Sequence, residues 1–427
     1  MSLAAEKSLR VLVVLPLYGG SLPVGRYAAR ALHSLGHTVE VFEAPGFHAA
    51  FTALKGLKVS SRRLEQLENS FLQLTSEAVL AKVESFEPDM VLALAQAPLS
   101  RRALHQLSRD KVVTAMWFVE DHAVFTYWRA FAPLYDIFAV IQKEPFLGLL
   151  KEVGVDNALY LPLAADPEFH RPLELSPLER RQYGSDLSFV GAGYPNRRRV
   201  FARLMQYDLK IWGSDWEGEL TISGRLQRGG ARIDPEEAVK IFNASSINLN
   251  LHSSLARDGQ VVAGDFVNPR TFELAACGAF QLVDRRTLLG ELFQDDELGV
   301  FEDVDQLTDL IEHYLPRQEE RKECSRRARE RVLQEHTYDR RMRSLIEFTA
   351  RRLPDWPRER GSEAAWPDLP PDLRQELSGL LDRLGLPATV AFKDLVWVVR
   401  SQQGRLSRLE TAILFLDEWQ KQYGRRS

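Results

Sequence analysis

The sequence predicts an α/β protein made of two doubly wound, Rossmann-like halves that face a cleft, followed by a helical extension. The chain of 427 residues is longer than the roughly 250 to 300 residues at which a single hydrophobic core stops growing. Its apolar segments are short and continuous, which is typical of parallel strands covered by helices on both faces. Two series of such segments, separated by helical stretches, follow one another along the chain.

The first series begins at residues 10–42, where an apolar strand, a Gly/Pro loop, an amphipathic helix and a second apolar strand form one βαβ unit. Residues 166–184 contain several prolines and no sustained period, so we interpret them as a linker. The segments before this linker predict an N-terminal domain over residues 1–165. Its later strands are expected at 90–95, 112–117, 136–141 and 158–163.

The second series predicts a C-terminal domain over residues 185–353, which three helices between residues 304 and 352 are expected to close. Residues 354–427 have helical periods and no strand partners, so they are interpreted as a helical extension that is a possible binding site for a protein partner. The strands of the second series are expected at 186–191, 209–213, 247–251, 280–284 and 299–303.

Composition argues against several classes of protein. The formal net charge is −4, and no basic stripe interleaved with aromatic residues stands out, so nucleic acid is not an expected partner. The two cysteines lie outside any Cys/His cluster, which fits a reducing compartment and no structural zinc. The apolar run 11–17 is too short to span a membrane, so we expect no integral membrane segment and a cytoplasmic location.

The strongest local signal is DFVNPRTFELAACGA, residues 265–279. Asn268 is expected to cap a helix with Pro269 at its first position, so that backbone N–H groups and Arg270 face an approaching phosphate. Glu273 lies on the first turns, where its carboxylate could accept hydrogen bonds from two ribose hydroxyls. An ordinary capped helix with Glu273 on a solvated face explains the pattern equally well.

This stretch, its continuation FQLVDRRTLLGELFQDDELGVFEDVDQLTDLIEHYL and the later ARERVLQEHTYDRRM resemble the C-terminal glycosyltransferase domain of the CgeB-like (spore maturation protein B) proteins. The resemblance covers roughly residues 185–350, and the N-terminal half only in overall pattern. It implies the GT-B fold and a bacterial enzyme of glycan biosynthesis. Such an enzyme moves a sugar from a nucleotide-diphosphate donor (a UDP-, GDP- or dTDP-sugar) to a glycan, protein or small-molecule acceptor.

The resemblance also implies roles for two carboxylates. Retaining GT-B families carry a Glu-x7-Glu motif at this point, and its second glutamate binds the nucleotide ribose. Glu273 matches that second position, which implies retention of the anomeric configuration. Asp265 stands at the first position and is the implied catalytic contact to the donor sugar, although the family residue there is one methylene longer.

A second candidate for donor binding is FVGAGYPNRRRVF, residues 189–201, where a strand runs into a loop and then a helix. Gly191 and Tyr194 lie in the loop, and Arg197 and Arg198 follow in the helix, so that backbone and guanidinium groups suit a diphosphate. CgeB-like sequences open their donor domain with this loop, whereas a solvated basic helix start is the simpler explanation. His252, at the end of the strand 247–251, is a candidate phosphate contact or a satisfied sheet histidine.

Acceptor-side candidates come from the N-terminal half. Asp121 and His122 follow the strand 112–117, at the carboxyl end where the residues of a cleft belong. An inverting transferase needs such a base, whereas a retaining one does not. CgeB-like proteins carry a similar Trp-then-Asp stretch, and capping by Asp121 is the competing explanation. Gly19 and Gly20, in the loop after the first strand, permit close approach of a donor phosphate or an acceptor.

Other enzyme classes are less well supported by the residues. No G-x-G-x-x-G is present, which disfavours an NAD-dependent dehydrogenase. The Asp-x-Asp at 303–305 is explained by helix capping, so we predict metal-independent transfer and no tightly bound cofactor, with arginines and a helix dipole neutralising the diphosphate. A hexosyltransferase-like enzyme is the prediction. The alternatives are a nucleotide-sugar epimerase on the same scaffold and a non-catalytic nucleotide-sugar-binding or assembly protein.

Overall fold

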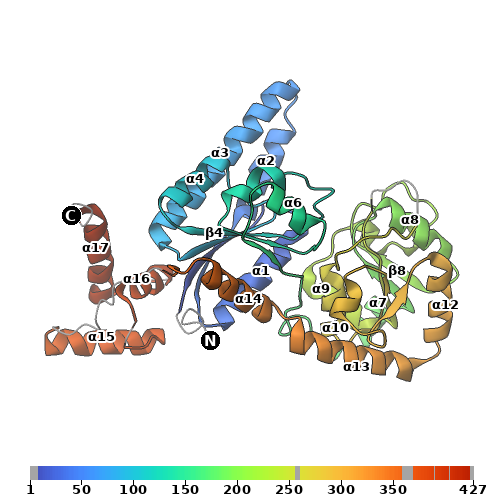
Figure 1. Ribbon diagram of the computed structural model, residues 1–427. Coiled ribbons are helices and arrows are strands. Elements are labelled where there is room, and N and C mark those ends of the chain that lie inside the picture. The colour runs from blue at the N-terminus through green and yellow to red at the C-terminus, as the bar shows by residue number, and fades with distance from the viewer. Residues whose placement is uncertain (1–7, 255–259, 358–368, 389, 403, 424–427) are drawn as a thin grey trace.

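Two parallel β-sheets form the framework of the molecule (Figure 1). The structure is a computed structural model, and it describes residues 8–423 except 255–259, 358–368, 389 and 403. The first sheet has the strand order β2-β1-β3-β4-β5-β6 and the second the order β11-β10-β9-β7-β8, with every neighbouring pair parallel. The predicted α/β class with two doubly wound halves is therefore confirmed.

Helices cover both faces of the first sheet, which explains why its strands are continuously apolar. In β1, Val11 and Val13 pack with α1 and with the later helix α14 (Tyr338–Arg352) on one face, whereas Leu12 and Val14 pack with α3 and α4 on the other. The strands are β1 (Arg10–Val14), β2 (Thr38–Phe42), β3 (Met90–Leu94), β4 (Val113–Phe118), β5 (Ile137–Val140) and β6 (Ala158–Tyr160). The helices are α1 (Ser21–Ser34), η2 (Ala44–Phe47), α2 (His48–Lys55), α3 (Ser61–Phe86), α4 (Arg101–Arg109), α5 (Trp128–Phe131), η3 (Ala132–Leu134) and α6 (Phe146–Glu152).

The second sheet is built in the same way from shorter strands. They are β7 (Leu187–Val190), β8 (Leu209–Trp212), β9 (Ile247–Asn250), β10 (Gln281–Asp284) and β11 (Gly299–Phe301). Its helices are α8 (Pro195–Phe201), η4 (Ala202–Leu204), η5 (Ser223–Arg225), η6 (Gln227–Gly230), α9 (Pro235–Ala244), α10 (Pro269–Ala276), α11 (Leu289–Leu292), α12 (Val304–Tyr314) and α13 (Gln318–Glu335).

The segment interpreted as a linker is partly helical. Residues Pro177–Tyr183 form α7, which begins with a capping box between Ser176 and Glu179. Glu179 also forms an ion pair with Lys240 of α9 at 2.9 Å. Seven residues are too few to show a helical period in the sequence, and the capping box is the signal that predicts this helix.

The last helix of the predicted C-terminal domain, α14 (Tyr338–Arg352), packs on the first half of the chain. Met342 and Leu345 are buried in the same apolar cluster as residues of β1 and α1. The indole of Trp356, just beyond the helix, donates to the carbonyl of Asp89 at 2.8 Å. The sequence expectation grouped α14 with the C-terminal domain, because an amphipathic pattern shows that a helix has an apolar face without showing what covers it.

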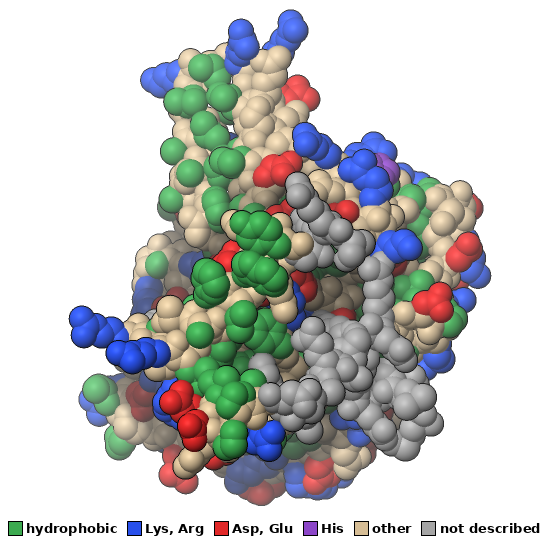
Figure 2. All heavy atoms as spheres, turned by 90° about the vertical axis from the view of Figure 1, so that its left-hand side faces the viewer, with side chains coloured by type: hydrophobic (Ala, Val, Ile, Leu, Met, Phe, Trp, Pro, Cys, Tyr) green, Lys and Arg blue, Asp and Glu red, His purple; other side chains and the backbone are tan. Residues whose placement is uncertain are grey.

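The extension consists of three helices, α15 (Pro371–Leu384), α16 (Phe392–Ser401) and α17 (Arg408–Tyr423), around a small apolar core of their own. It meets the N-terminal half where β1 begins and α3 ends: Asp394 binds Arg10 at 2.7 Å, and Trp397 packs on Phe86. Figure 2 shows apolar side chains gathered on this side of the molecule, and α17 exposes Phe415, Leu416, Trp419 and Tyr423. The extension therefore lies at the amino edge of the first sheet.

A buried arginine stabilises the point at which the chain returns from the second half to the first. Arg341 of α14 donates to the carbonyl of Pro162 at 2.7 Å and to that of Leu163. Arg341 also donates to Nδ1 of His336 at 2.8 Å. Because Nδ1 accepts this hydrogen bond, Nε2 of His336 carries the proton, and it donates to the carbonyl of Leu292 at 2.8 Å. Beside this junction, Ala165 pairs with Thr337 in a parallel bridge, so that both passages of the chain between the halves lie together.

We expect His336 to make stability depend on pH. Burial, aided by the charge of Arg341, lowers the pKa of the imidazole from 6.5 to about 4. The stabilisation by the neutral ring is therefore complete above pH 6.5 and is lost as the pH falls toward 4. Between pH 7.5 and 5.5 the wild type should lose about 1 kcal/mol more free energy of unfolding than His336→Gln, measured by urea denaturation. An equal loss in both proteins would contradict this account.

Candidate functional site

One buried glutamine links the two halves at the carboxyl ends of their strands. Gln142 follows β5 and is 2% exposed. Its Nε2 donates to Oδ1 of Asp265 at 2.8 Å and lies 3.4 Å from Oδ1 of Asp121. Its Oε1 accepts from the backbone N–H of His122 at 2.9 Å and lies 3.0 Å from Nδ1 of that ring. The three residues proposed from the sequence as catalytic therefore meet around one side chain.

The contacts of Gln142 determine which nitrogen of the neutral His122 ring carries the proton. Because the amide nitrogen faces two carboxylates, the amide oxygen faces the histidine and can only accept hydrogen bonds. Nδ1 must then donate, so Nε2 keeps its lone pair. The ring stacks on Phe146 with centroids 4.5 Å apart and is partly exposed. His122 is thus held in the form that accepts a hydrogen bond or a proton.

The carboxylates near Gln142 have different partners. Oδ1 of Asp121 accepts from the backbone N–H two residues later at 2.9 Å, so the capping role that the sequence left open is present as well. Asp265 binds the N–H of its own successor at 2.7 Å. Glu120 turns away and accepts from the hydroxyl of Tyr127 at 3.0 Å, and burial raises its pKa. Glu120 therefore stabilises the loop after β4 and stands apart from the candidate site.

The motif at 265–279 forms the cap that its sequence predicts. Asn268 is the N-cap of α10, and its side chain accepts from the N–H of Thr271 at 3.1 Å. Glu273 follows in the second turn with only 10% of its side chain exposed, so the alternative of a solvated face is wrong. Oε2 of Glu273 accepts from Arg270 at 2.6 Å, and Oε1 lies 3.8 Å from Nε2 of His170.

Residues from three other segments of the chain lie near Glu273. Nδ1 of His170 accepts from the N–H of Asp166 at 3.2 Å, so Nε2 carries the proton and faces the carboxylate. The ring of Tyr27, from α1, packs on the rings of His170 and Tyr338 at centroid distances of 4.9 and 5.3 Å. Burial and then the charge of Glu273 raise the pKa of both tyrosine hydroxyls, which keeps them protonated. Glu273 thus lies where α1, α10 and α14 meet.

The guanidinium groups of the 189–201 segment are bound by protein carbonyls. Arg197 donates to the carbonyls of Leu251 and Ala192 at 2.9 and 3.0 Å, and burial lowers its pKa to about 10. Arg198 donates to the carbonyls of Gly193, Asp215 and Glu217. Both arginines therefore hold the loops after β7, β8 and β9 together, and neither matches the solvated helix start that was the simpler expectation.

His252 is the satisfied sheet histidine that the sequence left as an alternative, and its assignment as a phosphate contact is corrected. Its side chain is 2% exposed. Nε2 accepts from the backbone N–H of Asn268 at 2.9 Å, and Nδ1 lies 2.7 Å from Oδ1 of Asp284. Because both ring nitrogens have protein partners, the ring positions the N-cap of α10 and is not available to a ligand.

The loop glycines fall into two groups. A Cβ on Gly191 would lie 2.9 Å from the Phe189 ring, and one on Gly193 would lie 2.2 Å from the carbonyl oxygen of Asp215, so neighbouring protein atoms require these glycines. A Cβ on Gly19 or Gly20 would meet no atom within 4 Å, and Gly19 has φ +109°. The first loop therefore leaves open space beside its backbone. Tyr194 is exposed at the start of α8, with its ring near Arg197.

Metal-binding groups are not gathered in the part of the chain that the structure describes, where no cluster of three His, Cys, Asp or Glu side chains is present. Asp303 caps α12 by accepting from the N–H of Gln306 at 2.9 Å, as its position predicts. None of the described helices is long and apolar enough to cross a membrane.

Sequence reasoning missed three residues of the site. Gln142 had one available signal, its position directly after a buried strand adjacent to β4. His170 lies in the proline-rich segment, and Tyr27 lies on the buried face of a helix, so neither position differs in sequence from ordinary linker or core. Only the fold brings them next to Glu273.

Comparisons with known proteins agree with this architecture. Residues 195–347 match a family model described as glycosyl transferase-like. Spore protein CgeB of Bacillus subtilis (strain 168) is 26% identical over 215 residues, which are 48% of this chain and 66% of that protein. The chain thus matches slightly less than two thirds of the length of CgeB. The resemblance to CgeB-like proteins is confirmed.

Solved structures place the fold. Sucrose-phosphate synthase from Thermosynechococcus elongatus superposes with a TM-score of 0.56 and 13% identity, covering 81% of this chain and 99% of that one. Anabaena HepE, solved in complex with UDP and glucose, superposes with a TM-score of 0.55 and 12% identity, covering 80% of this chain and 100% of that one. A putative UDP-N-acetylglucosamine 2-epimerase from Listeria monocytogenes superposes with a TM-score of 0.51 and 11% identity, covering 81% of this chain and 97% of that one. The chain has the GT-B fold, and the matches together support a glycosyltransferase.

We expect Gln142→Leu to disturb both halves of the site. The change removes the amide that satisfies Asp265 and His122 while keeping the side chain's size, so the free energy of unfolding should fall by about 1–3 kcal/mol in urea denaturation. Histidine ¹⁵N NMR should show that Nδ1 of His122 is no longer uniformly protonated. The matched control is Gln73→Leu on the exposed face of α3, which should change stability by less than about 0.5 kcal/mol. An unchanged ¹⁵N spectrum in Gln142→Leu would contradict the tautomer assignment.

Proposed function

We propose that the protein transfers a sugar from a nucleotide-diphosphate sugar, held by the C-terminal half, to an acceptor held by the N-terminal half. The observation that carries the proposal is the bridge through Gln142, which joins the acceptor-side pair Asp121 and His122 to Asp265 on the donor side. In open parallel sheets ligands bind beyond the carboxyl ends of the strands, and here those ends come from both sheets.

Glu273 is the residue proposed to bind the donor ribose. One carboxylate oxygen is already occupied by Arg270, and the other lies 3.8 Å from His170, beyond a direct hydrogen bond. An ionised carboxylate has lone pairs for several donors, so Oε1 is suited to two vicinal hydroxyls. Tyr27 of α1 and Tyr338 of α14 lie near enough to Glu273 for its charge to add to the effect of burial in raising the pKa of both hydroxyls, so a movement of one half relative to the other changes the surroundings of this carboxylate.

Arg270 is the cation proposed for the diphosphate, with Arg197 close enough for the charge of Arg270 to lower its pKa further. Arg270 would contact the leaving diphosphate, the buried charge of Arg197 would add to its stabilisation from a distance, and the transfer is proposed to need no metal ion. Retention of configuration is proposed on the position of Glu273 within the segment that matches glycosyl transferases. In a retaining reaction Nε2 of His122 would orient the acceptor hydroxyl as a hydrogen-bond acceptor. UDP is the first nucleotide to test, because HepE, with the same fold, was solved with UDP and UDP-glucose.

Thermal unfolding tests the donor site. One of the UDP-, GDP- or dTDP-sugars, in EDTA and at 100 times its dissociation constant, should stabilise the wild type by about 2.7 kcal/mol. Glu273→Gln should lose most of this stabilisation because its amide oxygen is a weaker acceptor for the ribose hydroxyls. Glu152→Gln, an exposed carboxylate on α6, should retain it. If no nucleotide sugar stabilises any of the three proteins, the proposed donor site is wrong.

His122→Asn separates the acceptor site from the donor site. The variant should keep the donor-induced stabilisation, because His122 lies on the other side of Gln142, while transfer to an acceptor should fall by about 10²-fold through misplacement of the hydroxyl. The measurement is release of nucleoside diphosphate with and without a panel of acceptor sugars. An altered nucleotide sugar formed without acceptor would favour an epimerase. Binding without turnover would favour the non-catalytic alternative, in which the extension recruits a partner.

A further inference from the structure

A helical hairpin projects from the N-terminal half beyond the rest of the fold. It is formed by α2 and the first turns of α3, and Figure 1 shows it extending away from the sheet. None of the residues of α2 is buried. At the turn between the helices, Leu57 is 47% exposed and Val59 is 46% exposed. A projecting turn that presents aliphatic side chains to solvent contributes little to the core beneath it.

The tip of this hairpin carries positive charges, and the carboxylates Glu65 and Glu68 follow further along α3. Residues 44–64 contain Lys55, Lys58, Arg62 and Arg63 and no aspartate or glutamate, in a chain whose formal net charge is −4. Among the described residues, the one acidic side chain within ion-pair distance of these cations is Glu68, 3.8 Å from Lys55. Figure 2 shows Lys and Arg side chains at the end of the projection, with apolar side chains below them. The tip is therefore both cationic and apolar.

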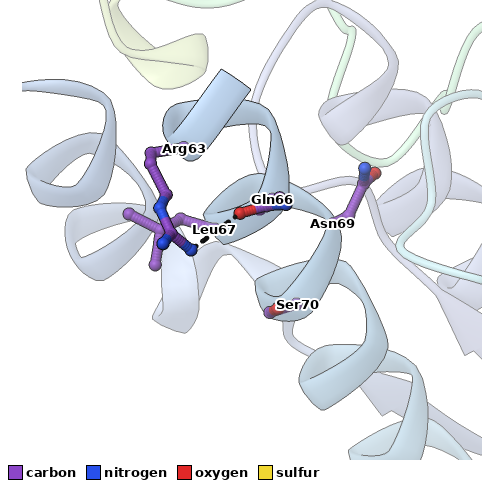
Figure 3. A pocket seen from close by; sticks show the side chains of 5 residues that line it. All are labelled: Arg63, Gln66, Leu67, Asn69 and Ser70. Carbon is purple, nitrogen blue, oxygen red and sulfur yellow. Dashed lines mark hydrogen bonds between the residues drawn. The ribbon is translucent and has the colours of Figure 1, made fainter. Parts of the chain in front are cut away.

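A hollow lies beside this tip on α3 and offers polar groups next to a cation. Figure 3 shows its lining, in which Nη1 of Arg63 donates to Oε1 of Gln66 at 3.1 Å. The other lining residues are Leu67, Asn69 and Ser70. The guanidinium of Arg63, the amide of Gln66 and the hydroxyl of Ser70 lie along this hollow and can hydrogen-bond a phosphate group and its neighbouring oxygens, whereas Asn69 points away from them.

We propose that the α2–α3 hairpin binds the surface of an anionic lipid bilayer. Four cations without carboxylates between them are attracted to the negative potential of such a surface, and aliphatic side chains between the cations can enter the boundary between headgroups and acyl chains. A soluble polyanion such as a nucleic acid satisfies the cations but offers no apolar region for Leu57 and Val59. The hollow at Arg63 then receives a headgroup phosphate.

The position of the hairpin gives lipid binding a consequence for the site. The ring of His48, the first residue of α2, packs on that of Tyr18 with centroids 5.0 Å apart. Tyr18 precedes Gly19 and Gly20, whose backbone borders open space. Binding of the tip therefore holds the first loop of the N-terminal half about one helix length from the lipid surface, roughly 12 Å for the eight residues of α2, on the side that faces an acceptor attached to a lipid.

Vesicle sedimentation of the full chain tests the proposal. The protein should sediment with vesicles of phosphatidylcholine and phosphatidylglycerol, much less with phosphatidylcholine alone, and less at high salt. Lys58→Gln combined with Arg62→Gln should weaken binding by about fivefold for each cation removed. The control, Lys151→Gln with Arg181→Gln, makes the same charge change at exposed positions outside the hairpin and should bind as the wild type does.

A second pair of variants distinguishes the lipid from a soluble polyanion. Leu57→Ser with Val59→Ser changes two exposed apolar side chains and leaves every charge of the hairpin in place. This variant should bind vesicles more weakly while its binding to duplex DNA stays unchanged. The proposal is overturned if the wild type does not sediment with phosphatidylglycerol vesicles, or if the Lys58/Arg62 variant binds as tightly as its control. It is also overturned if the Leu57/Val59 variant binds vesicles as the wild type does, since the partner is then any polyanion. These outcomes do not depend on nucleotide-sugar binding, which thermal unfolding reports separately.

Discussion

The guanidinium group of Arg341 is the interaction on which the arrangement of the two sheets depends. It donates to carbonyls on both passages of the chain, at Pro162 and Leu163 on the way out and at Glu335 on the way back. Burial lowers its pKa to about 10, which still leaves it charged at neutral pH. A buried charge is tolerated only where its donors are satisfied, so the guanidinium of Arg341 holds these carbonyls in place around it. The junction therefore fixes the chain at the point where the halves could swing apart.

That junction explains why the site forms between the halves. Both sheets direct the carboxyl ends of their strands toward the same region, and Gln142 spans it by donating to Asp265 and accepting from His122. Several polar residues that the sequence suggested as ligand contacts instead form hydrogen bonds with other parts of the protein. Arg197, Arg198 and His252 hold three strand-end loops and the N-cap of α10 in place. Ligand contacts are thereby left to side chains on a rigid framework, such as Glu273 and Arg270.

Much of the fold was predictable because continuous apolar strands and capped helices are local patterns. The cap at Asn268 and Pro269 is an example, since hydrogen bonds within three residues decide it. The site was predictable only in part. The sequence identifies Arg198 as a cation at a helix start, but two of the carbonyls that it binds lie 17 and 19 residues away, and no local rule names them. The packing of α14 on α1 and the approach of Tyr27 to Glu273 are likewise decided by tertiary contacts.

Different groups of residues lie at the amino and at the carboxyl ends of the strands of the first sheet. Its amino edge carries the extension through Arg10, Asp394, Phe86 and Trp397, and its carboxyl edge carries the first loop and the loops around Gln142. A parallel sheet places all its strand ends of one kind on one edge, so these two groups of residues lie a full strand length apart. A partner bound to the exposed aromatic side chains of α17 would therefore leave the candidate site accessible. The α2–α3 hairpin, which is joined to the first loop through His48 and Tyr18, belongs to the carboxyl edge, and whatever it binds is brought toward the site.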